Sequence, residues 1–334
     1  MCRLAKLGIM SAHTTHPVAA NVGVSAYGRS EPTFETVMNM TSIDEQAAVL
    51  ALTMATHDKP WHHTARAIAA AGSARKLFDG ELDGLQDNDK AHAAAISGTV
   101  RHDDLDRARE LISSMGSRGV GLVTVLDEDY PGNMFWTNSY QPFLWVRGHL
   151  APEDHRSVAV VGEHDREHAA AAARILSAAG LTVVAPLHTE FGITVHENAG
   201  RTWGVLDRGM DQLQRSGRYA TVADQVAERG ALVSPFWPAT IATDRTAALT
   251  PIVTCGSAAI VYVVDGRANG FSQRHVTDAL KTGKPVFVPQ QLHQEQPWVA
   301  QAGFRGGITA VQDIDDFCQQ AVNLVDMASQ PTMF

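Results

Sequence analysis

The stretch SVAVVGEHDREHAAAAARILSAAGLTVVA, residues 157–185, decides the fold class of this chain. Two apolar runs, Val158–Val161 and Leu181–Ala185, flank an alanine-rich segment with helical spacing, and a glycine follows both the first run and the helix. A third apolar run, Trp203–Leu206, comes after a short polar helix. Short β-branched runs that alternate with helices are typical of βαβ units and of a parallel sheet. The sequence therefore predicts an α/β fold with a mostly parallel sheet and helices on both faces.

The predicted sheet also indicates where a ligand would bind. In parallel sheets, ligands bind beyond the carboxyl ends of the strands, where loops and helix N-termini hold anions. Here those loops follow the three runs and begin at Gly162, Ala185 and Asp207. We expect any functional site to lie there.

Composition limits the class of protein. The 334 residues are 45% hydrophobic and 19% charged, which is usual for a soluble globular protein. The net charge of −9 argues against a basic nucleic-acid coat but not against a local basic groove. An odd number of distant cysteines (Cys2, Cys255 and Cys318) favours free thiols in a reducing cytosol. Neither a signal peptide nor a membrane span is apparent, so we expect a cytoplasmic protein without a membrane partner.

The chain divides into four predicted parts. Residues 1–40 lack periodicity and are expected to form a flexible tail. Ser42 and Glu45 form a capping box at the start of a helical module, residues 41–119, which we expect to pack or interact without chemistry. Residues 120–326 carry the α/β domain, and residues 327–334 a second tail.

Further elements are expected after Asp211. They are a helix at 222–228, strands at 230–234, 258–264 and 285–289, and helices at 270–282 and 313–325. A long loop that begins at Pro235 carries Arg245.

The order of motifs resembles that of the DNA-processing protein A (DprA/Smf) family, bacterial single-stranded DNA-binding recombination mediators with a Rossmann-like domain. The resemblance covers roughly residues 120–315. Its motifs are Asp129-Tyr130-Pro131, Pro142–Gly148, Val158–Gly162, Val183–His196, Thr202–Asp211, Ala258–Asp265 and Ser272–Pro289. The winged-helix domain that ends many relatives is expected to be absent here.

Several positions depart from the family pattern. Relatives place Ser-Arg after the first strand's glycine, where this chain has Glu163-His164. Thr189 stands where a second cation is expected, and Arg245 alone remains of an Arg-Asn-Arg segment. These changes predict weaker phosphate contacts than those of relatives with intact cationic loops.

The resemblance implies a non-enzymatic protein that binds single-stranded DNA, dimerises and delivers the DNA to a RecA-type recombinase. The implied DNA contacts are Gly162, His164, Arg166, His196, Arg245, Arg274 and Lys284. His196 has a second interpretation, a structural histidine in the second loop. Arg245 and Lys284 are predicted to share one functional surface, and neither side chain is expected to be needed for folding. Of the two, Lys284 is the poorer candidate for a DNA contact because it precedes its strand.

Motifs of enzymes and cofactors are missing. There is no Gly-x-Gly-x-x-Gly fingerprint, phosphate-binding P-loop or Gly-x-Ser-x-Gly elbow, so we assign no catalytic residue and no cofactor. The histidine pairs His13/His16 and His62/His63 lack further ligands at metal-binding spacing, so no metal site is assigned. Two alternatives stay open. One is a nucleotide-binding or nucleotide-cleaving protein of the lysine-decarboxylase-like/SLOG group using Glu163, Asp207 and Asp211, and the other is a degenerate scaffold.

Overall fold

The computed structural model describes residues 41–56 and 60–328. The predicted tail at 1–40, with its histidine pair, and residues 329–334 lie outside the described residues. The helical module comprises α1 (Ile43–Ala55), α2 (Trp61–Ala71), α3 (Ala74–Phe78), α4 (Asp87–Ser97) and α5 (His102–Gly116). None of the helices in the described part of the chain is long and apolar enough to cross a membrane.

The capping box at α1 is only half formed. The Ser42 hydroxyl accepts a hydrogen bond from the Glu45 amide at 3.2 Å, as expected. The Glu45 carboxylate instead turns toward α3, where it accepts hydrogen bonds from the Ser73 hydroxyl and from the amides of Ala74 and Arg75. Glu45 therefore joins two helices at their N-termini, where a negative charge is favourable.

The described strands form one nine-stranded sheet in the order β1-β2-β6-β5-β4-β3-β7-β8-β9. Their bounds are β1 (Gly121–Thr124), β2 (Phe143–Gly148), β3 (Ser157–Val161), β4 (Thr182–Pro186), β5 (Thr202–Val205), β6 (Ala231–Ser234), β7 (Ile260–Val263), β8 (Val286–Pro289) and β9 (Ile308–Val311). Strands β3 to β9 are parallel, and β1 and β2 extend the sheet in antiparallel fashion. The predicted fold class is confirmed.

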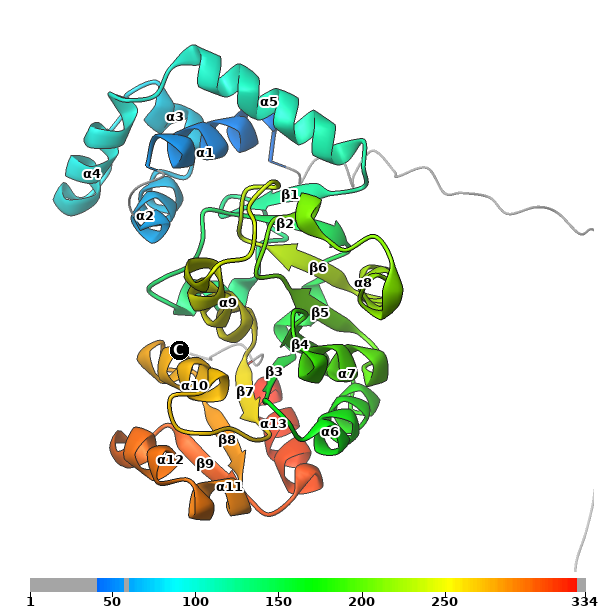
Figure 1. The fold of residues 1–334 in the computed structure, drawn as a ribbon. Coiled ribbons are helices and arrows are strands. Elements are labelled where there is room, and N and C mark those ends of the chain that lie inside the picture. Colours follow the sequence, from blue (N-terminus) through cyan, green and yellow to red (C-terminus); the bar gives the residue numbers. More distant parts are fainter. Residues whose placement is uncertain (1–40, 57–59, 329–334) are drawn as a thin grey trace, which may run out of the picture. The chain divides into compact units, whose positions relative to one another are not determined.

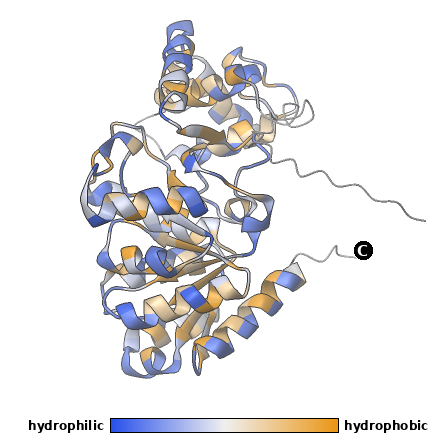
Figure 2. Ribbon diagram, turned by 90° about the vertical axis from the view of Figure 1, so that its right-hand side faces the viewer, coloured by the Kyte–Doolittle hydropathy of each residue, from blue (hydrophilic) through white to orange (hydrophobic). Residues whose placement is uncertain are grey.

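Helices cover both faces of this sheet (Figure 1). On one side lie α6 (Arg166–Ala178), α7 (Glu190–Asn198) and α8 (Gly217–Arg229), and on the other α9 (Asp244–Ser257) and α10 (Phe271–Lys281). Alternate residues of β3 contribute to two separate cores, Val158 and Val160 to one and Ala159 and Val161 to the other. Figure 2 shows the apolar strands between helices whose outer surfaces are hydrophilic.

The sequence analysis missed several elements. The segment predicted as a loop around Arg245 is the helix α9, which contains Pro251 and is buried along much of its length. A buried helix lacks the polar stripe by which an amphipathic helix is predicted, and an internal proline argues against a helix. The sequence of α9 therefore gave no helical signal. Also unpredicted were α11 (Gln290–Glu295), α12 (Pro297–Ala302) and β9, whereas α13 (Ile314–Ala328) extends into the predicted second tail.

The helical module shares one hydrophobic core with the sheet across the predicted boundary at residue 119. The Gln46 side-chain amide donates to the Leu122 carbonyl at 2.9 Å. The Trp61 ring lies 5.7 Å from that of Phe143 and 5.9 Å from that of Trp237. The division into two separable domains stays a prediction.

Candidate nucleic-acid interface

The candidate site lies at the carboxyl edge of the sheet, where β3 and β7 are neighbours. From β3 the strand order runs through β4, β5 and β6 in one direction, and from β7 through β8 and β9 in the other. Such a switch point is where open α/β sheets hold ligands. The loops that follow β3 and β7 therefore form the centre of the site.

Each of these two loops is capped by a carboxylate from the other. Asp265, after β7, accepts hydrogen bonds from the backbone amides of Glu163, His164 and Asp165 at 2.6, 2.8 and 3.2 Å. In return, the largely buried Glu163 carboxylate accepts a hydrogen bond from the Ser272 amide at the start of α10, at 3.1 Å. The first amides of the loop after β3, and the Ser272 amide at the start of α10, are therefore bonded to protein carboxylates.

This arrangement weighs against nucleotide binding at the switch point. A nucleotide phosphate needs free amides or cations, and a carboxylate already occupies that position in both loops. Glu163 thus acts as a helix cap, which leaves its proposed role in nucleotide chemistry without support.

Gly162 permits the close packing of the first loop. A Cβ atom at this position would lie 2.2 Å from the Phe191 ring and 2.5 Å from a carboxylate oxygen of Asp265. Gly162 therefore lets Asp265 approach the amides that follow it, and Asp265 accepts hydrogen bonds from those amides. The DNA contact at Gly162 stays a prediction.

Exposed basic side chains surround the capped loops. His164 and Arg267 each leave 76% of the side chain exposed, and both lie near one oxygen of Glu163, at 3.8 and 3.4 Å. Arg166, the first residue of α6, lies 3.5 Å from the Glu190 carboxylate. We call His164, Arg166 and Arg267 the basic loop cluster. Sequence reasoning missed Arg267, although it directly follows Asp265-Gly266 at a strand's carboxyl end.

Two further predicted contacts occupy the same edge. Arg245 lies in the first turn of α9, after β6, and Arg274 in the first turn of α10, after β7. Both are exposed, and neither forms an ion pair within the described residues. They stay predicted DNA contacts, Arg245 on a helix instead of a loop.

His196 does not belong to the interface. It is fully buried in α7, with Nδ1 2.8 Å from the Thr202 hydroxyl and Nε2 3.2 Å from the Ala185 carbonyl oxygen. Burial lowers the pKa of His196 to about 4, so the ring is neutral near pH 7. The structural interpretation holds, and the predicted DNA contact is wrong.

The predicted DNA contact of Lys284 is also wrong. Lys284 is only 5% exposed and precedes β8, at the amino edge of the sheet. Its Nζ donates to the carbonyl oxygens of Asn133 and Ala258, both at 2.8 Å. Burial lowers the pKa of Lys284 to about 8. The predicted surface shared with Arg245 is therefore wrong.

A partly buried aromatic side chain lies beside the basic loop cluster. The centroid of the Phe271 ring, at the start of α10, lies 5.5 Å from that of the His188 ring and 4.3 Å from that of the His275 ring. Phe191 and Trp203 are buried in the core, whereas Phe271 keeps part of its side chain exposed at the carboxyl edge.

A comparison with models of protein families identifies the family of this chain. A family model for DNA recombination-mediator protein A matches residues 121–322, more than half of the chain. The chain belongs to this family. The resemblance stated from the motifs is thereby confirmed.

Solved structures support the fold. DNA processing protein A from Streptococcus pneumoniae has a TM-score of 0.58 at 15% identity, over 84% of this chain and 98% of the other. DNA processing protein A from Helicobacter pylori, described as binding single-stranded DNA, has a TM-score of 0.54 at 18% identity, over 61% of this chain and 96% of the other. A search of curated proteins gave no match.

Proposed function

We propose that this member of the family binds single-stranded DNA across the carboxyl edge of its sheet. The basic loop cluster carries the proposal, since it gathers exposed basic side chains at the switch point. Arg245 and Arg274 extend the basic surface along the same edge. Arginine suits this role because its planar guanidinium can form two hydrogen bonds to one phosphate.

The contacts come from side chains and not from loop amides, because Asp265 and Glu163 occupy those amides. Glu163 and Glu190 also neutralise part of the basic loop cluster. Binding is therefore modest and depends on salt, since each phosphate contact to a single strand changes the slope of log affinity against log salt by about 0.7. Phe271 offers a face on which a base can stack.

Non-enzymatic delivery of the bound strand to a RecA-type recombinase, by a homodimer, is the further part of this proposal. It rests on membership of the recombination-mediator family. Light scattering of the purified chain tests the dimer. A strand-exchange assay with a RecA-type recombinase tests delivery, where stimulation that depends on the basic loop cluster is the expected result.

DNA binding itself is tested by fluorescence anisotropy with labelled oligo-dT over a salt series. Arg267→Ala and Arg166→Ala should each weaken binding and lower the salt slope by about 0.7. Arg101→Ala is the matched control, because Arg101 is a similarly exposed arginine at the start of α5 in the helical module. Equal losses in all three variants, or no loss in the first two, would show that the carboxyl edge is not the DNA site.

A further inference from the structure

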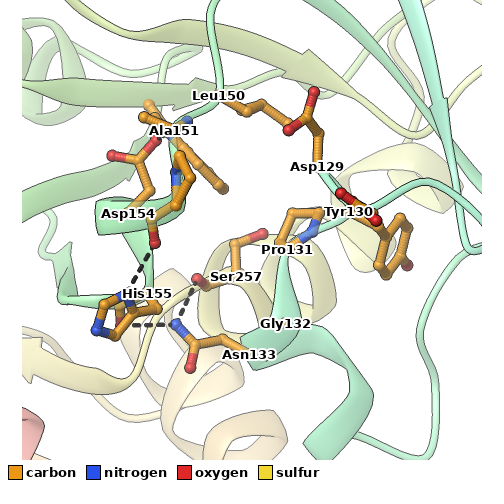
Figure 3. A pocket seen from close by; sticks show the side chains of 13 residues that line it. Asp129, Tyr130, Pro131, Gly132, Asn133, Leu150, Ala151, Asp154, His155 and Ser257 are labelled. Atoms are coloured by element: carbon orange, nitrogen blue, oxygen red, sulfur yellow. Dashed lines mark hydrogen bonds between the residues drawn. The ribbon is translucent and has the colours of Figure 1, made fainter. Parts of the chain in front are cut away.

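A pocket of about 390 Å³ opens at the opposite, amino edge of the sheet. The residues that line it include Glu128, Asp129, Pro131, Leu150, Trp203 and Ser257. Figure 3 shows these side chains converging from the loop after β1, the segment before β3 and the end of α9. The volume falls within the range of small-molecule sites.

The inner wall is apolar and firmly held. Leu150 and Trp203 are almost completely buried there. The Trp203 indole nitrogen donates to Asp154 at 3.1 Å, and Asp154 receives two hydrogen bonds from Arg201 at 2.5 and 2.6 Å. The charge of Asp154 is thus matched within the protein, and the wall can pack against an aliphatic chain.

The mouth of the pocket carries unmatched negative charge. Glu128 and Asp129 are exposed, and neither pairs with a cation within residues 41–56 and 60–328. No lysine or arginine lines the pocket. A cationic group at the mouth would therefore gain from two carboxylates without displacing an internal partner.

A buried hydroxyl independently points to a ligand. Ser257 is only 1% exposed, lines the pocket, and its Oγ has no hydrogen-bond partner in the structure. Figure 3 shows the Ser257 side chain directed toward the space between Asp129 and Asp154. An unpartnered buried hydroxyl is unfavourable, and a bound polar group is one way to satisfy it.

We propose that this pocket binds a small aliphatic amine with two or more nitrogen atoms. One ammonium group lies between Glu128 and Asp129, the alkyl chain packs along Leu150 and Pro131, and a second nitrogen meets the Ser257 hydroxyl. The site is separate from the proposed DNA interface, because the two lie at opposite edges of the sheet. Failure of DNA binding would leave this inference untouched.

Calorimetric titration of the full chain with spermidine at low salt tests the inference. Binding at one site is expected, with a loss of about tenfold or more in the double variant Glu128→Gln/Asp129→Asn, which corresponds to about 1.4 kcal/mol. Ser257→Ala should also weaken binding while leaving the melting temperature unchanged, because its hydroxyl has no partner to lose. Asp103→Asn/Glu110→Gln, which neutralises two exposed carboxylates on α5, is the charge-matched control and should bind like the parent.

Two outcomes would overturn the inference. One is that spermidine binds all four proteins alike, which would indicate attraction to the net negative charge only. The other is that spermidine fails to bind while a lysine-containing peptide binds in a way that depends on Glu128 and Asp129. The cation would then come from a protein partner and not from a free amine.

Discussion

Glu163 and Asp265 cap each other's loops, so that two neighbouring carboxylates occupy the anion positions at the switch point. The two residues are 102 positions apart in the chain. These hydrogen bonds hold the β3–α6 loop against the loop after β7 and the start of α10. Stability and DNA affinity should therefore respond in opposite directions when one of these carboxylates is removed.

Asp265→Ala should lower the free energy of unfolding by about 1–3 kcal/mol, because one partly buried amide and two exposed amides lose a charged acceptor. The same change frees the amides of Glu163, His164 and Asp165 and removes a negative charge, so affinity for oligo-dT per folded molecule should rise. Urea denaturation and anisotropy measure the two effects. Asp103→Ala should change neither, and a loss of affinity in Asp265→Ala would contradict the capping argument.

His164→Arg should tighten DNA binding and steepen the salt slope by about 0.7, because it places a permanent cation on an exposed side chain. Adding Glu163→Ser should raise affinity further by removing a carboxylate beside Arg267. The double variant should also be less stable, since the Ser272 amide loses its acceptor. If neither variant changes affinity over the salt series, the first loop takes no part in DNA binding.

Arg245→Ala and Lys284→Ala should behave differently. Arg245 is exposed, so its loss should cost about 1–3 kcal/mol of DNA binding with little change in melting temperature. Lys284→Ala leaves the carbonyl oxygens of Asn133 and Ala258 without their donor, so it should lower stability and leave DNA affinity per folded molecule unchanged. Thermal melts and anisotropy on the same samples distinguish the two. A fully stable Lys284→Ala variant would contradict the structural role.

Acid should destabilise the protein between about pH 6.5 and pH 4. Burial lowers the pKa of His196 and of His275 to about 4, so both are neutral in the folded chain until that pH. In the unfolded chain they bind protons near pH 6.5. Stability is therefore full above pH 6.5 and falls as the pH drops toward 4, by about 3 kcal/mol for each histidine.

Urea denaturation at several pH values measures this loss. His196→Gln removes one of the two groups and should make the decline shallower over the same window. His293→Gln, in α11, is the control because that side chain is exposed. An equal slope in the parent and in His196→Gln would contradict the assignment.

A chain that begins at Arg118 tests the predicted domain boundary. Removal of the helices exposes Phe143 and Trp237, on which Trp61 packs, and leaves the Leu122 carbonyl without Gln46. We expect the shortened chain to keep a cooperative melt at a lower temperature. Aggregation without a cooperative transition would show that the boundary is wrong.

The central strands could be predicted because they are buried on both faces and appear as uninterrupted apolar runs such as Val158–Val161, whereas the edge strand β9, which is largely exposed, could not. The helix α9 could not, because Pro251 and the lack of a polar face hide it. In the site, Gly162 and Arg166 were assigned to the correct edge from their place after β3. The burial of Lys284 and His196 could not be predicted, because it depends on how other segments pack around them.

The mutual capping by Glu163 and Asp265 also could not be predicted from the sequence. Glu163 looked like an unfavourable charge in a phosphate loop, since its partner, the Ser272 amide, is 109 residues away. A contact over such a separation leaves no local pattern. Only the neighbouring positions of β3 and β7 in the sheet bring the two loops together.

Asp154 has a consequence for the lifetime of the folded state. It receives hydrogen bonds from Thr182, Arg201 and Trp203, which are 28, 47 and 49 residues further along the chain. Since contacts between distant segments require long loops to close, this cluster should form late in folding. Contacts absent from the transition state act mainly on the unfolding rate. The hydrogen bonds of Asp154 should therefore lower the unfolding rate more than they raise the folding rate.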